Sequence, residues 1–302
     1  MSHTPVLLQE VLEMLDPRPG DFVIDGTVDG GGHAAAILER IGPNGKFLGL
    51  DLDEAMLADC KTRIAPSKNT RLLVGNYADL PEILAREGLG KANGLLLDLG
   101  FSSEQIEHSE RGFSFSEASR DEPLLMTYDD SRIPVREILK TISEKELAEI
   151  LFNLGGERQR GRIARAIVER RRKKGGLETS GDLADTIRAA LPRGYEHGRI
   201  DAATRTFQAL RILANGELEN LQRVLDSLED ILVPGGRVAA ISFHSLEDRI
   251  VKQSFRNMIK NSKMELLTKR PMKPIVASRE EIAANPRSRS AKLRAGKIVN
   301  SH

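Results

Sequence analysis

The stretch Asp21-Phe-Val-Ile-Asp-Gly-Thr-Val-Asp-Gly-Gly-Gly-His33 decides the fold. Its apolar run, Asp21–Asp25, predicts a buried strand that ends in a glycine-rich turn. A helix is predicted from His33 to about Ile41. Glycine lets a backbone approach a ligand closely, and the amides at a helix N-terminus can receive a carboxylate. This one stretch therefore predicts a strand, a ligand-binding turn and a helix, in that order.

The same alternation continues along the chain. Short apolar runs predict further strands at Lys46–Asp51, Arg71–Gly75 and Gly94–Asp98. Helices are predicted between them, over Glu54–Ile64 and Leu80–Arg86. Buried strands that alternate with helices form a parallel sheet with right-handed crossovers. We therefore expect an α/β fold with a Rossmann-like core.

The strand pattern stops between residues 106 and 211. Helix signals replace it: the capping box Ser143-Glu-Lys-Glu146, the apolar stripe Ile163, Ala166 and Ile167, and the N-terminal signal Thr179-Ser-Gly-Asp182. We therefore expect a helical domain over residues 106–211, inserted into a core that is formed by residues 1–105 and 212–302.

The α/β pattern resumes after this insertion. A long helix is predicted because five leucines share one helical face, namely Leu218, Leu221, Leu225, Leu228 and Leu232. Val233-Pro-Gly-Gly236 predicts a tight turn. The strongly apolar run Arg237–Phe243 predicts a strand, and another strand is expected near Met264–Thr268.

Composition indicates a soluble protein of a reducing compartment. Hydrophobic residues make up 40% and charged residues 29% of the chain, which is typical of globular proteins. No apolar stretch is long enough to span a bilayer, and the N-terminus lacks the features of a secretion signal. Cys60 is the only cysteine, so no internal disulfide can form. We expect a cytoplasmic protein with no membrane partner.

The net charge is only +1, but the basic residues are unevenly distributed. Residues 157–174 hold nine Arg or Lys and two Glu. Five more basic residues follow Asn285 without an acid, namely Arg287, Arg289, Lys292, Arg294 and Lys297. Two basic segments on a nearly neutral chain favour a polyanionic partner. The alternative is that each charged run is the solvated face of an element.

Four pieces of sequence are expected to meet at the carboxyl ends of the first four strands, where open α/β sheets bind ligands. They are Asp25-Gly-Thr-Val-Asp-Gly-Gly-Gly-His33, Asp51, Asn76-Tyr-Ala-Asp79 and Asp98-Leu-Gly-Phe-Ser-Ser103. Asp51 has the usual position of an acid that binds a ribose. Tyr77 is an aromatic residue that could lie against an adenine ring.

Domains that bind NAD also have a glycine turn, so an NAD-dependent oxidoreductase is an alternative. Two features favour S-adenosylmethionine as the cofactor. The spacing Gly26…Gly30-Gly-Gly-His33 differs from the dinucleotide pattern Gly-x-Gly-x-x-Gly. In addition, the turn Leu232-Val-Pro-Gly-Gly236 before a late apolar strand is common in methyltransferases with such a sheet.

Longer motifs connect the chain with one family. They are His3-Thr-Pro-Val-Leu-Leu-Gln-Glu10, Asp25-x-Thr-x-x-x-Gly-Gly-His33, Leu97-Asp-Leu-Gly-x-Ser-Ser-x-Gln105, Arg111-Gly-Phe-Ser-Phe115, Gly156-Glu-Arg158, Ala164-Arg-Ala-Ile167, Ala203-Thr-Arg-Thr-Phe-Gln208, Ile241-Ser-Phe-His-Ser-Leu-Glu-Asp-Arg249 and Asn285-Pro-Arg-Ser-Arg-Ser290. In these motifs the chain resembles, almost end to end, the ribosomal RNA small subunit methyltransferase H family. That family methylates N4 of a cytidine in the decoding region of 16S rRNA.

The resemblance implies a class I methyltransferase core with an inserted helical domain that binds RNA. It implies S-adenosyl-L-methionine as the cofactor, no metal, and 16S rRNA within the small ribosomal subunit as the partner. By position, the family's cofactor contacts fall on Gly31, Gly32, His33, Asp51, Tyr77, Asp98 and Gln105. Without the motifs, His33 would be interpreted as a helix cap and Gln105 as a surface residue.

The chain departs from the family pattern at several positions. Asp29 and Ala34 stand where the family usually has glycine and serine. Leu125 replaces an acid and Thr127 replaces an arginine. If those two groups orient the target nucleotide in the family, this chain orients it differently or has another acceptor. A non-catalytic, RNA-binding ribosome assembly factor and, less favoured, a DNA amino-methyltransferase are therefore alternatives.

Asp98 is the main candidate for catalysis. A methyl group on a sulfonium needs no metal to activate it, but conjugation makes the amino group of cytosine a poor nucleophile. A carboxylate that accepts a hydrogen bond from this amino group favours its reactive form, so we expect Asp98 to lie between donor and acceptor. The alternative is an acid that faces only the cofactor.

Ser102 and His244 are the other candidates for catalysis. Ser102 follows the fourth strand and could place the base. His244 follows the late strand and could contact a flipped base or remove its proton. A buried structural role for His244 is the alternative.

Overall fold

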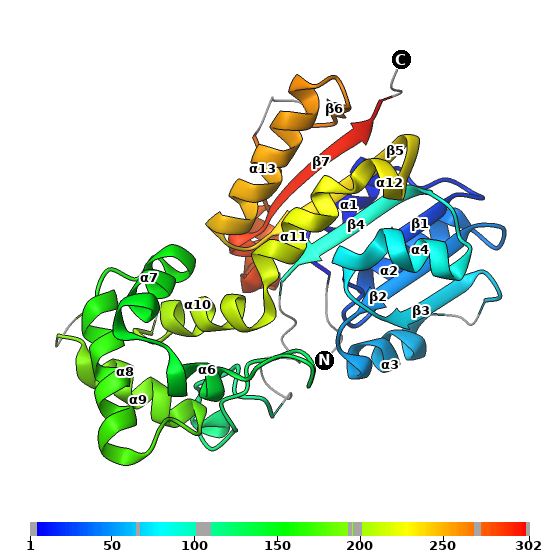
Figure 1. Ribbon diagram of the computed structural model, residues 1–302. Coiled ribbons are helices and arrows are strands. Elements are labelled where there is room, and N and C mark those ends of the chain that lie inside the picture. Colours follow the sequence, from blue (N-terminus) through cyan, green and yellow to red (C-terminus); the bar gives the residue numbers. More distant parts are fainter. Residues whose placement is uncertain are drawn as a thin grey trace. The chain divides into compact units, whose positions relative to one another are not determined.

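The computed structural model describes residues 5–64, 67–100, 110–192, 195, 201–268 and 273–299. The chain forms two compact units (Figure 1). The first, called the core unit, consists of Met1–Gly100 and Leu218–His302. The second, called the insertion unit, consists of Phe101–Glu217. Two separate parts of the chain therefore build the core unit.

The described part of the core unit contains a seven-stranded sheet in the order β3-β2-β1-β4-β5-β7-β6 (Figure 1). The strands are β1 Phe22–Asp25, β2 Lys46–Asp51, β3 Thr70–Val74, β4 Ala92–Leu99, β5 Leu232–Ser242, β6 Met264–Leu266 and β7 Lys292–Ile298. The first five strands are parallel, and β7 is antiparallel to β5 and β6. The carboxyl ends of the parallel strands therefore share one edge.

Helices pack on both faces of this sheet. They are α1 Leu8–Leu15, α2 Gly32–Ile41, α3 Glu54–Arg63, α4 Leu80–Glu87, α11 Glu217–Asp226, α12 Leu228–Ile231, α13 Ser245–Lys260 and α14 Arg279–Ala284. One apolar cluster joins the sheet to α4, α11, α12 and α13, and a second joins it to α1, α2 and α3. Neighbouring residues of β1 belong to different clusters, Val23 to the second and Ile24 to the first, because side chains alternate along a strand.

The predicted α/β pattern is confirmed. β2 has the predicted bounds, and the ends of β1, β3 and β4 differ from the predicted ranges by one or two residues. The helices predicted between these strands are also present as α2, α3 and α4. Apolar runs that end in an acid or glycine were therefore sufficient to place this half of the sheet.

The long helix predicted from five leucines is wrong in its last part. α11 ends at Asp226, and Ser227 interrupts the helical path before the short α12. The Ser227 hydroxyl donates to carbonyls one turn back in α11, which offers the backbone an alternative to continuing the helix. Leu232 starts β5 rather than ending the helix.

The turn predicted at Val233–Gly236 is a bulge inside β5. Ala92 of β4 pairs with Leu232, and Gly94 pairs with Arg237, so the extra residues of β5 are accommodated between these two pairs. Gly235 has φ +85°, a conformation that favours glycine. The glycines therefore mark an irregular strand rather than a connection.

The basic C-terminal segment is partly a strand of the sheet. β7 covers Lys292–Ile298, and Arg294 within it is 5% exposed. Arg294 Nε donates to Asp248 Oδ1 at 2.8 Å, and Lys292 Nζ lies 3.5 Å from Asp248 Oδ2. These two cations are therefore paired within the core unit, whereas Arg287 and Arg289 are exposed.

The insertion unit is helical in its described part. Its helices are α6 Val135–Thr141, α7 Glu144–Gly155, α8 Arg160–Lys174, α9 Ser180–Ala190 and α10 Thr204–Asn215. Both predicted N-terminal signals are confirmed as capping boxes, with Ser143 and Thr179 as the caps. Ile163 and Ile167 are fully buried in an apolar cluster of this unit, whereas Ala166 is only half-buried.

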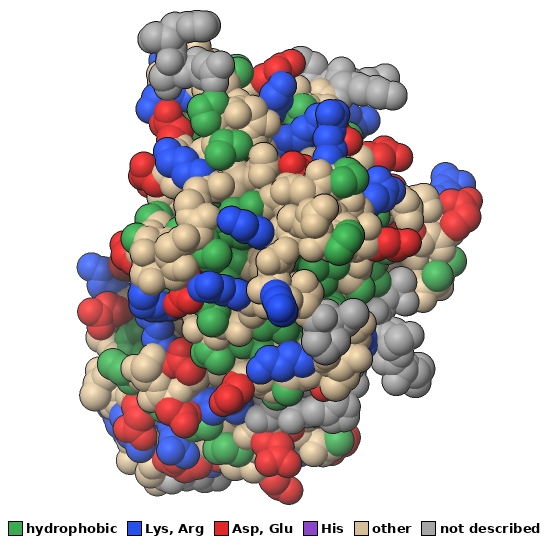
Figure 2. Space-filling view, turned by 90° about the vertical axis from the view of Figure 1, so that its right-hand side faces the viewer, with side chains coloured by type: hydrophobic (Ala, Val, Ile, Leu, Met, Phe, Trp, Pro, Cys, Tyr) green, Lys and Arg blue, Asp and Glu red, His purple; other side chains and the backbone are tan. Residues whose placement is uncertain are grey.

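The surface is mixed in charge. On the face shown in Figure 2, Lys and Arg side chains lie among Asp and Glu side chains. Within the described residues, no helix is both long and apolar enough to cross a membrane.

Candidate active site

Three acids lie at the carboxyl edge of the sheet. β1 ends at Asp25, β2 ends at Asp51, and Asp98 is the penultimate residue of β4. β1 lies between β2 and β4, so its neighbours bring Asp51 and Asp98 to the two sides of Asp25. All three side chains are buried, with exposed fractions of 0% for Asp25, 8% for Asp51 and 6% for Asp98. Such a cluster of buried acids is a strong candidate for a ligand site.

The glycine turn after β1 is fixed to both neighbouring strands. The Val28 amide donates to the Leu50 carbonyl of β2 at 2.9 Å. On the other side, the Asp98 amide donates to Thr27 Oγ1 at 2.7 Å. The turn therefore holds a defined position over the tips of β2 and β4.

Gly26 and Gly31 provide space that no other residue would leave. Gly31 has φ +81°, and a Cβ there would lie 2.9 Å from the Cys60 sulfur. A Cβ on Gly26 would lie 2.9 Å from Leu97 Cδ2 and 3.1 Å from Tyr77 Cβ. Gly32 follows as the first residue of α2, so the helix amides begin directly at this turn.

Asp29 and Asp51 are connected through the backbone. The Asp29 amide donates to Asp51 Oδ2 at 3.0 Å, and the Asp53 amide donates to Asp51 Oδ1 at 2.9 Å. These bonds fix the carboxyl group of Asp51, while burial raises its pKa to about 6. Asp29 has φ +46°, in the left-handed region, which explains why glycine is also suited to this position.

Asp25 and Asp98 each keep one oxygen without a hydrogen-bond partner in the described structure, Asp25 Oδ2 and Asp98 Oδ1. Burial raises the pKa of Asp25 to about 7. Burial, followed by the charges of Asp25 and Glu247, raises the pKa of Asp98 to about 8. Buried, unpaired carboxyl oxygens are costly unless a ligand satisfies them. A cationic ligand such as a sulfonium fits this cluster, because it would offset the repulsion between the acids.

His33 lies in the same buried cluster and is 6% exposed. Its Nε2 lies 3.0 Å from the Val6 carbonyl oxygen, and its Nδ1 lies 3.5 Å from Asp98 Oδ2. The side chain therefore contacts the N-terminal segment and the acid of β4. The sequence analysis predicted His33 as a cofactor contact, with a helix cap as the alternative.

Of the other predicted site residues, the structure describes Tyr77 and His244. Tyr77 is half-buried beside the glycine turn, and Ser102 and Gln105 lie outside the described residues. His244 is the N-cap of α13: its Nδ1 accepts from the Glu247 amide at 3.4 Å, and the Glu247 carboxylate accepts from the His244 amide. His244 therefore has a structural role as a helix cap, which the sequence analysis gave as the alternative.

The sequence analysis placed Asp25 and Thr27 in the stretch that reaches the site but gave neither side chain a role. The signal was present, because an acid closes each of β1, β2 and β4 at nearly the same position. The Val6 contact had no comparable signal, since its backbone carbonyl acts irrespective of side-chain type.

Thr127, one of the departures noted above, is fully buried in the insertion unit. Arg111 donates through Nη2 to Thr127 Oγ1 at 2.8 Å and through Nε to the Thr127 carbonyl at 2.6 Å. Arg111 also contacts Asp130 Oδ1 at 2.8 Å. Thr127 thus serves as a partner of Arg111.

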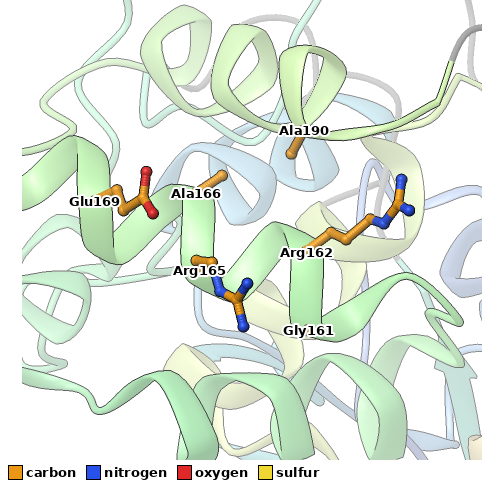
Figure 3. Close-up of a pocket in the computed structure, with 6 residues that line it drawn as sticks. All are labelled: Gly161, Arg162, Arg165, Ala166, Glu169 and Ala190. Carbon is orange, nitrogen blue, oxygen red and sulfur yellow. The ribbon is translucent and has the colours of Figure 1, made fainter.

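A second region of interest is the outer face of α8 in the insertion unit. A cavity of about 540 Å³ lies there, lined by Gly161, Arg162, Arg165, Ala166, Glu169 and Ala190 (Figure 3). Arg162 and Arg165 extend from α8, and Ala190 belongs to α9 (Figure 3). Arg165 pairs with Glu144 at 3.4 Å, so Arg162 is the guanidinium at this cavity that suits an anionic partner.

The sheet order, the antiparallel β7 and the acids at the tips of β1, β2 and β4 define a class I methyltransferase that uses S-adenosylmethionine. The chain belongs to the MraW methylase family, because the model of that family matches residues 1–299.

Its curated relatives are similar over nearly their whole length. Ribosomal RNA small subunit methyltransferase H of Syntrophus aciditrophicus is 43% identical, covering 98% of both chains. The protein of that name from Heliobacterium modesticaldum is 44% identical, also covering 98% of both chains. That from Syntrophotalea carbinolica is 45% identical over 97% of each chain. The family resemblance inferred from the motifs is confirmed.

Proposed function

We propose that this chain transfers the methyl group of S-adenosylmethionine to N4 of a cytidine in the decoding region of 16S rRNA. The main supporting observation is Asp98 Oδ1, which is buried at the carboxyl edge of the sheet and has no hydrogen-bond partner among the described residues. The name shared by the curated relatives supports an acceptor in small-subunit rRNA. The target nucleotide follows from the resemblance described above.

The residues at the sheet edge would hold the cofactor. Gly31 and Gly32 would bring backbone amides close to it, Asp51 would bind the ribose hydroxyls, and Tyr77 would lie against the adenine. Asp25 and Asp98 supply negative charge for its cationic end. S-adenosylmethionine, when bound, supplies a methyl group on a positively charged sulfur.

Asp98 would act on the acceptor amino group. Its Oδ1 accepts a hydrogen bond from N4, which draws the nitrogen lone pair out of conjugation with the ring. As the bond from N4 to the methyl carbon forms and the bond from sulfur to that carbon breaks, N4 becomes positively charged. The proton on N4 then passes to Asp98 Oδ1.

Burial makes Asp98 a stronger base at the right stage of this reaction. Asp98 would be held ionised by the positive charge of bound S-adenosylmethionine, and it would lose this stabilisation once the methyl group had been transferred. The pKa of about 8 that burial gives Asp98 in the free protein then favours uptake of the proton. Asp98 alone can therefore accept the proton, while His244 caps α13 through Nδ1.

The insertion unit would bind the RNA, chiefly through α8. Arg170 contacts Asp182 at 2.9 Å, and Arg171 donates to two carbonyls at the end of α6, so both have structural roles. Arg162 and Arg172 are exposed and lie on one face of α8 together with Arg165, which pairs with Glu144 of α7 at 3.4 Å. This face can meet phosphates without breaking the fold.

We further propose that the domain division and cellular setting follow from this role. Residues 106–211 would form the RNA-binding domain, and residues 1–105 and 212–302 the catalytic domain. The partner would be 16S rRNA within the small ribosomal subunit, which places the protein in the cytoplasm.

Incubation with labelled S-adenosylmethionine and small subunits that lack base methylation tests the proposal. Label should appear on one cytidine of 16S rRNA, and digestion to nucleosides should yield N4-methylcytidine. The Asp98→Ala variant should remain folded and transfer no label. Binding of subunits without any transfer by the wild-type protein would instead support a non-catalytic assembly factor. Normal transfer by Asp98→Ala would exclude Asp98 from the mechanism.

A further inference from the structure

The N-terminal segment Pro5–Leu7 is held in an unusual conformation inside the core unit. Val6 is 4% exposed and Leu7 is fully buried. Leu7 has φ +54°, in the left-handed region, which is strained for a residue with a side chain. Such a conformation persists only where surrounding contacts hold it, and it often marks a functional position.

Two contacts hold this segment. The Leu7 amide donates to Glu281 Oε1 of α14 at 2.8 Å. Pro5 packs on the first residue of α2, where a Cβ on Gly32 would lie 3.0 Å from Pro5 Cδ. The backbone of Val6, between these two anchors, therefore has a fixed place beside the glycine turn.

The fixed Val6 carbonyl determines the state of His33. A carbonyl oxygen only accepts hydrogen bonds, so His33 Nε2, at 3.0 Å, carries the hydrogen. In the neutral imidazole this leaves Nδ1 as the acceptor for a proton on Asp98 Oδ2, which lies 3.5 Å away; an ionised Asp98 is held instead by the protonated imidazole, whose Nδ1 then carries a hydrogen. His33 thus faces one oxygen of Asp98, while the other, Oδ1, keeps no partner in the described structure.

We infer that Pro5–Leu7 is a positioning element of the active site: it orients Asp98 through His33, so that Asp98 Oδ1 faces the acceptor. This inference rests on the proposed role of Asp98 in methyl transfer. Both ring nitrogens of His33 are directed at groups of the protein, so its imidazole is a positioning residue rather than a ligand of the cofactor. Glu281 acts from further away, by holding Leu7.

Substitutions at Glu281 test the connection without touching the pocket. Glu281→Ala removes the acceptor for the Leu7 amide, whereas Glu281→Gln retains an oxygen that can accept. Loss of orientation by about 1 Å can reduce turnover up to about 100-fold. We expect kcat to fall at least tenfold in Glu281→Ala and to stay within about threefold of wild type in Glu281→Gln. The dissociation constant of S-adenosylhomocysteine, measured by calorimetry, should remain within twofold in both.

Two further variants complete the test. Glu280→Ala removes the neighbouring, exposed acid of α14 and should leave kcat unchanged. His33→Phe fills the same space without nitrogens and should lower kcat at least as much as Glu281→Ala. The two defects should not add in the double variant, because both act through the orientation of Asp98.

The outcomes separate this inference from the proposed function. Absence of transfer by the wild-type protein contradicts the proposed function itself. Normal kcat in Glu281→Ala, or equal losses in the Ala and Gln variants, contradicts the positioning role while transfer stands. A parallel loss of S-adenosylhomocysteine binding would show that the segment shapes the cofactor pocket instead.

Discussion

Asp98 combines a structural cost with a proposed chemical use. Its folded pKa of about 8 exceeds the ordinary value of 3.8, so the folded protein holds a proton that the unfolded chain loses. The contribution of Asp98 to the free energy of unfolding therefore falls as the pH rises from about 4 to about 8. A residue that destabilises the fold at working pH is expected where function requires it.

The variant Asp98→Asn should show both the stability cost and the catalytic use of Asp98. It cannot ionise, so it should have a higher Tm than wild type at pH 9 in the absence of cofactor, with the difference shrinking toward pH 4. Methyl transfer should be lost. Thermal unfolding at pH 5, 7 and 9 measures the first effect, and Asp121→Asn, which removes an exposed acid, is the control. A Tm difference that does not vary with pH would contradict the assignment.

Proton release on cofactor binding is a second expectation at this scale. A sulfonium favours ionised Asp98, so S-adenosylmethionine should bind with release of a proton below pH 8, and its affinity should increase with pH from 6 to 8. S-adenosylhomocysteine lacks the sulfonium but carries the same amino acid group. The ratio of the two affinities isolates the contribution of the sulfonium charge. Calorimetry in buffers of different ionisation enthalpy measures both the affinities and the number of protons released. In Asp98→Asn the pH dependence of this ratio should be smaller than in wild type, and what remains is due to Asp25, whose pKa of about 7 lies in the same range.

At the scale of elements, the turn between β1 and α2 depends on Gly31. Gly31 and Gly88 both have left-handed φ, +81° and +64°, but only Gly31 has atoms within 4 Å of an added Cβ. Gly88→Ala should therefore lower the free energy of unfolding by about 1–2 kcal/mol. Gly31→Ala should lower it by an additional 1–3 kcal/mol or so, because the Cβ overlaps Cys60.

Cofactor binding distinguishes these two variants further. Gly31→Ala should weaken S-adenosylhomocysteine binding, whereas Gly88→Ala at the end of α4 should not. Urea unfolding and calorimetry measure the two effects. Equal stability losses would mean that the Cys60 contact adjusts without cost.

Most of the sheet could be predicted because its strands are apolar runs with clear ends. β7 could not, because Arg294 and Lys292 made its sequence resemble a basic tail. The cost of burying Arg294 is offset by Asp248 of α13, about 46 residues away in sequence. The helix break at Ser227 was also missed, because the spacing of the five leucines fits one continuous helix better than it fits the separate helices α11 and α12.

The site could be predicted in part. The tips of parallel strands meet, so Asp51 and Asp98 could be placed together from their positions alone. The His33 contacts required knowledge of where Val6 lies, and Leu7 owes its left-handed conformation to Glu281, which is 274 residues away. Such long-range backbone contacts leave no local pattern in the sequence.

At the scale of the whole molecule, RNA affinity should depend strongly on salt. The logarithm of the binding constant should fall with the logarithm of salt concentration by about 0.7–0.9 for each phosphate contacted. The double variant Arg162→Gln/Arg172→Gln should bind 16S rRNA more weakly and reduce this slope by about 1.5. Filter binding at 50–300 mM salt, roughly spanning the physiological value, measures both.

The control removes two exposed lysines from the core unit, Lys46→Gln/Lys61→Gln. It causes the same loss of charge, and its affinity should stay close to wild type. A similar loss in both double variants would mean that binding depends on net charge and not on the face of α8.

The split core unit has a consequence for synthesis. β4 leaves the ribosome with only β1 as a neighbour, because its other partner, β5, follows about 130 residues later. At translation rates of about 5–20 residues per second, the edge of β4 waits roughly 7–26 seconds for β5. During that interval the insertion unit can fold, while an apolar strand remains open to wrong partners. The nascent chain is therefore expected to need chaperone protection until its last hundred residues emerge.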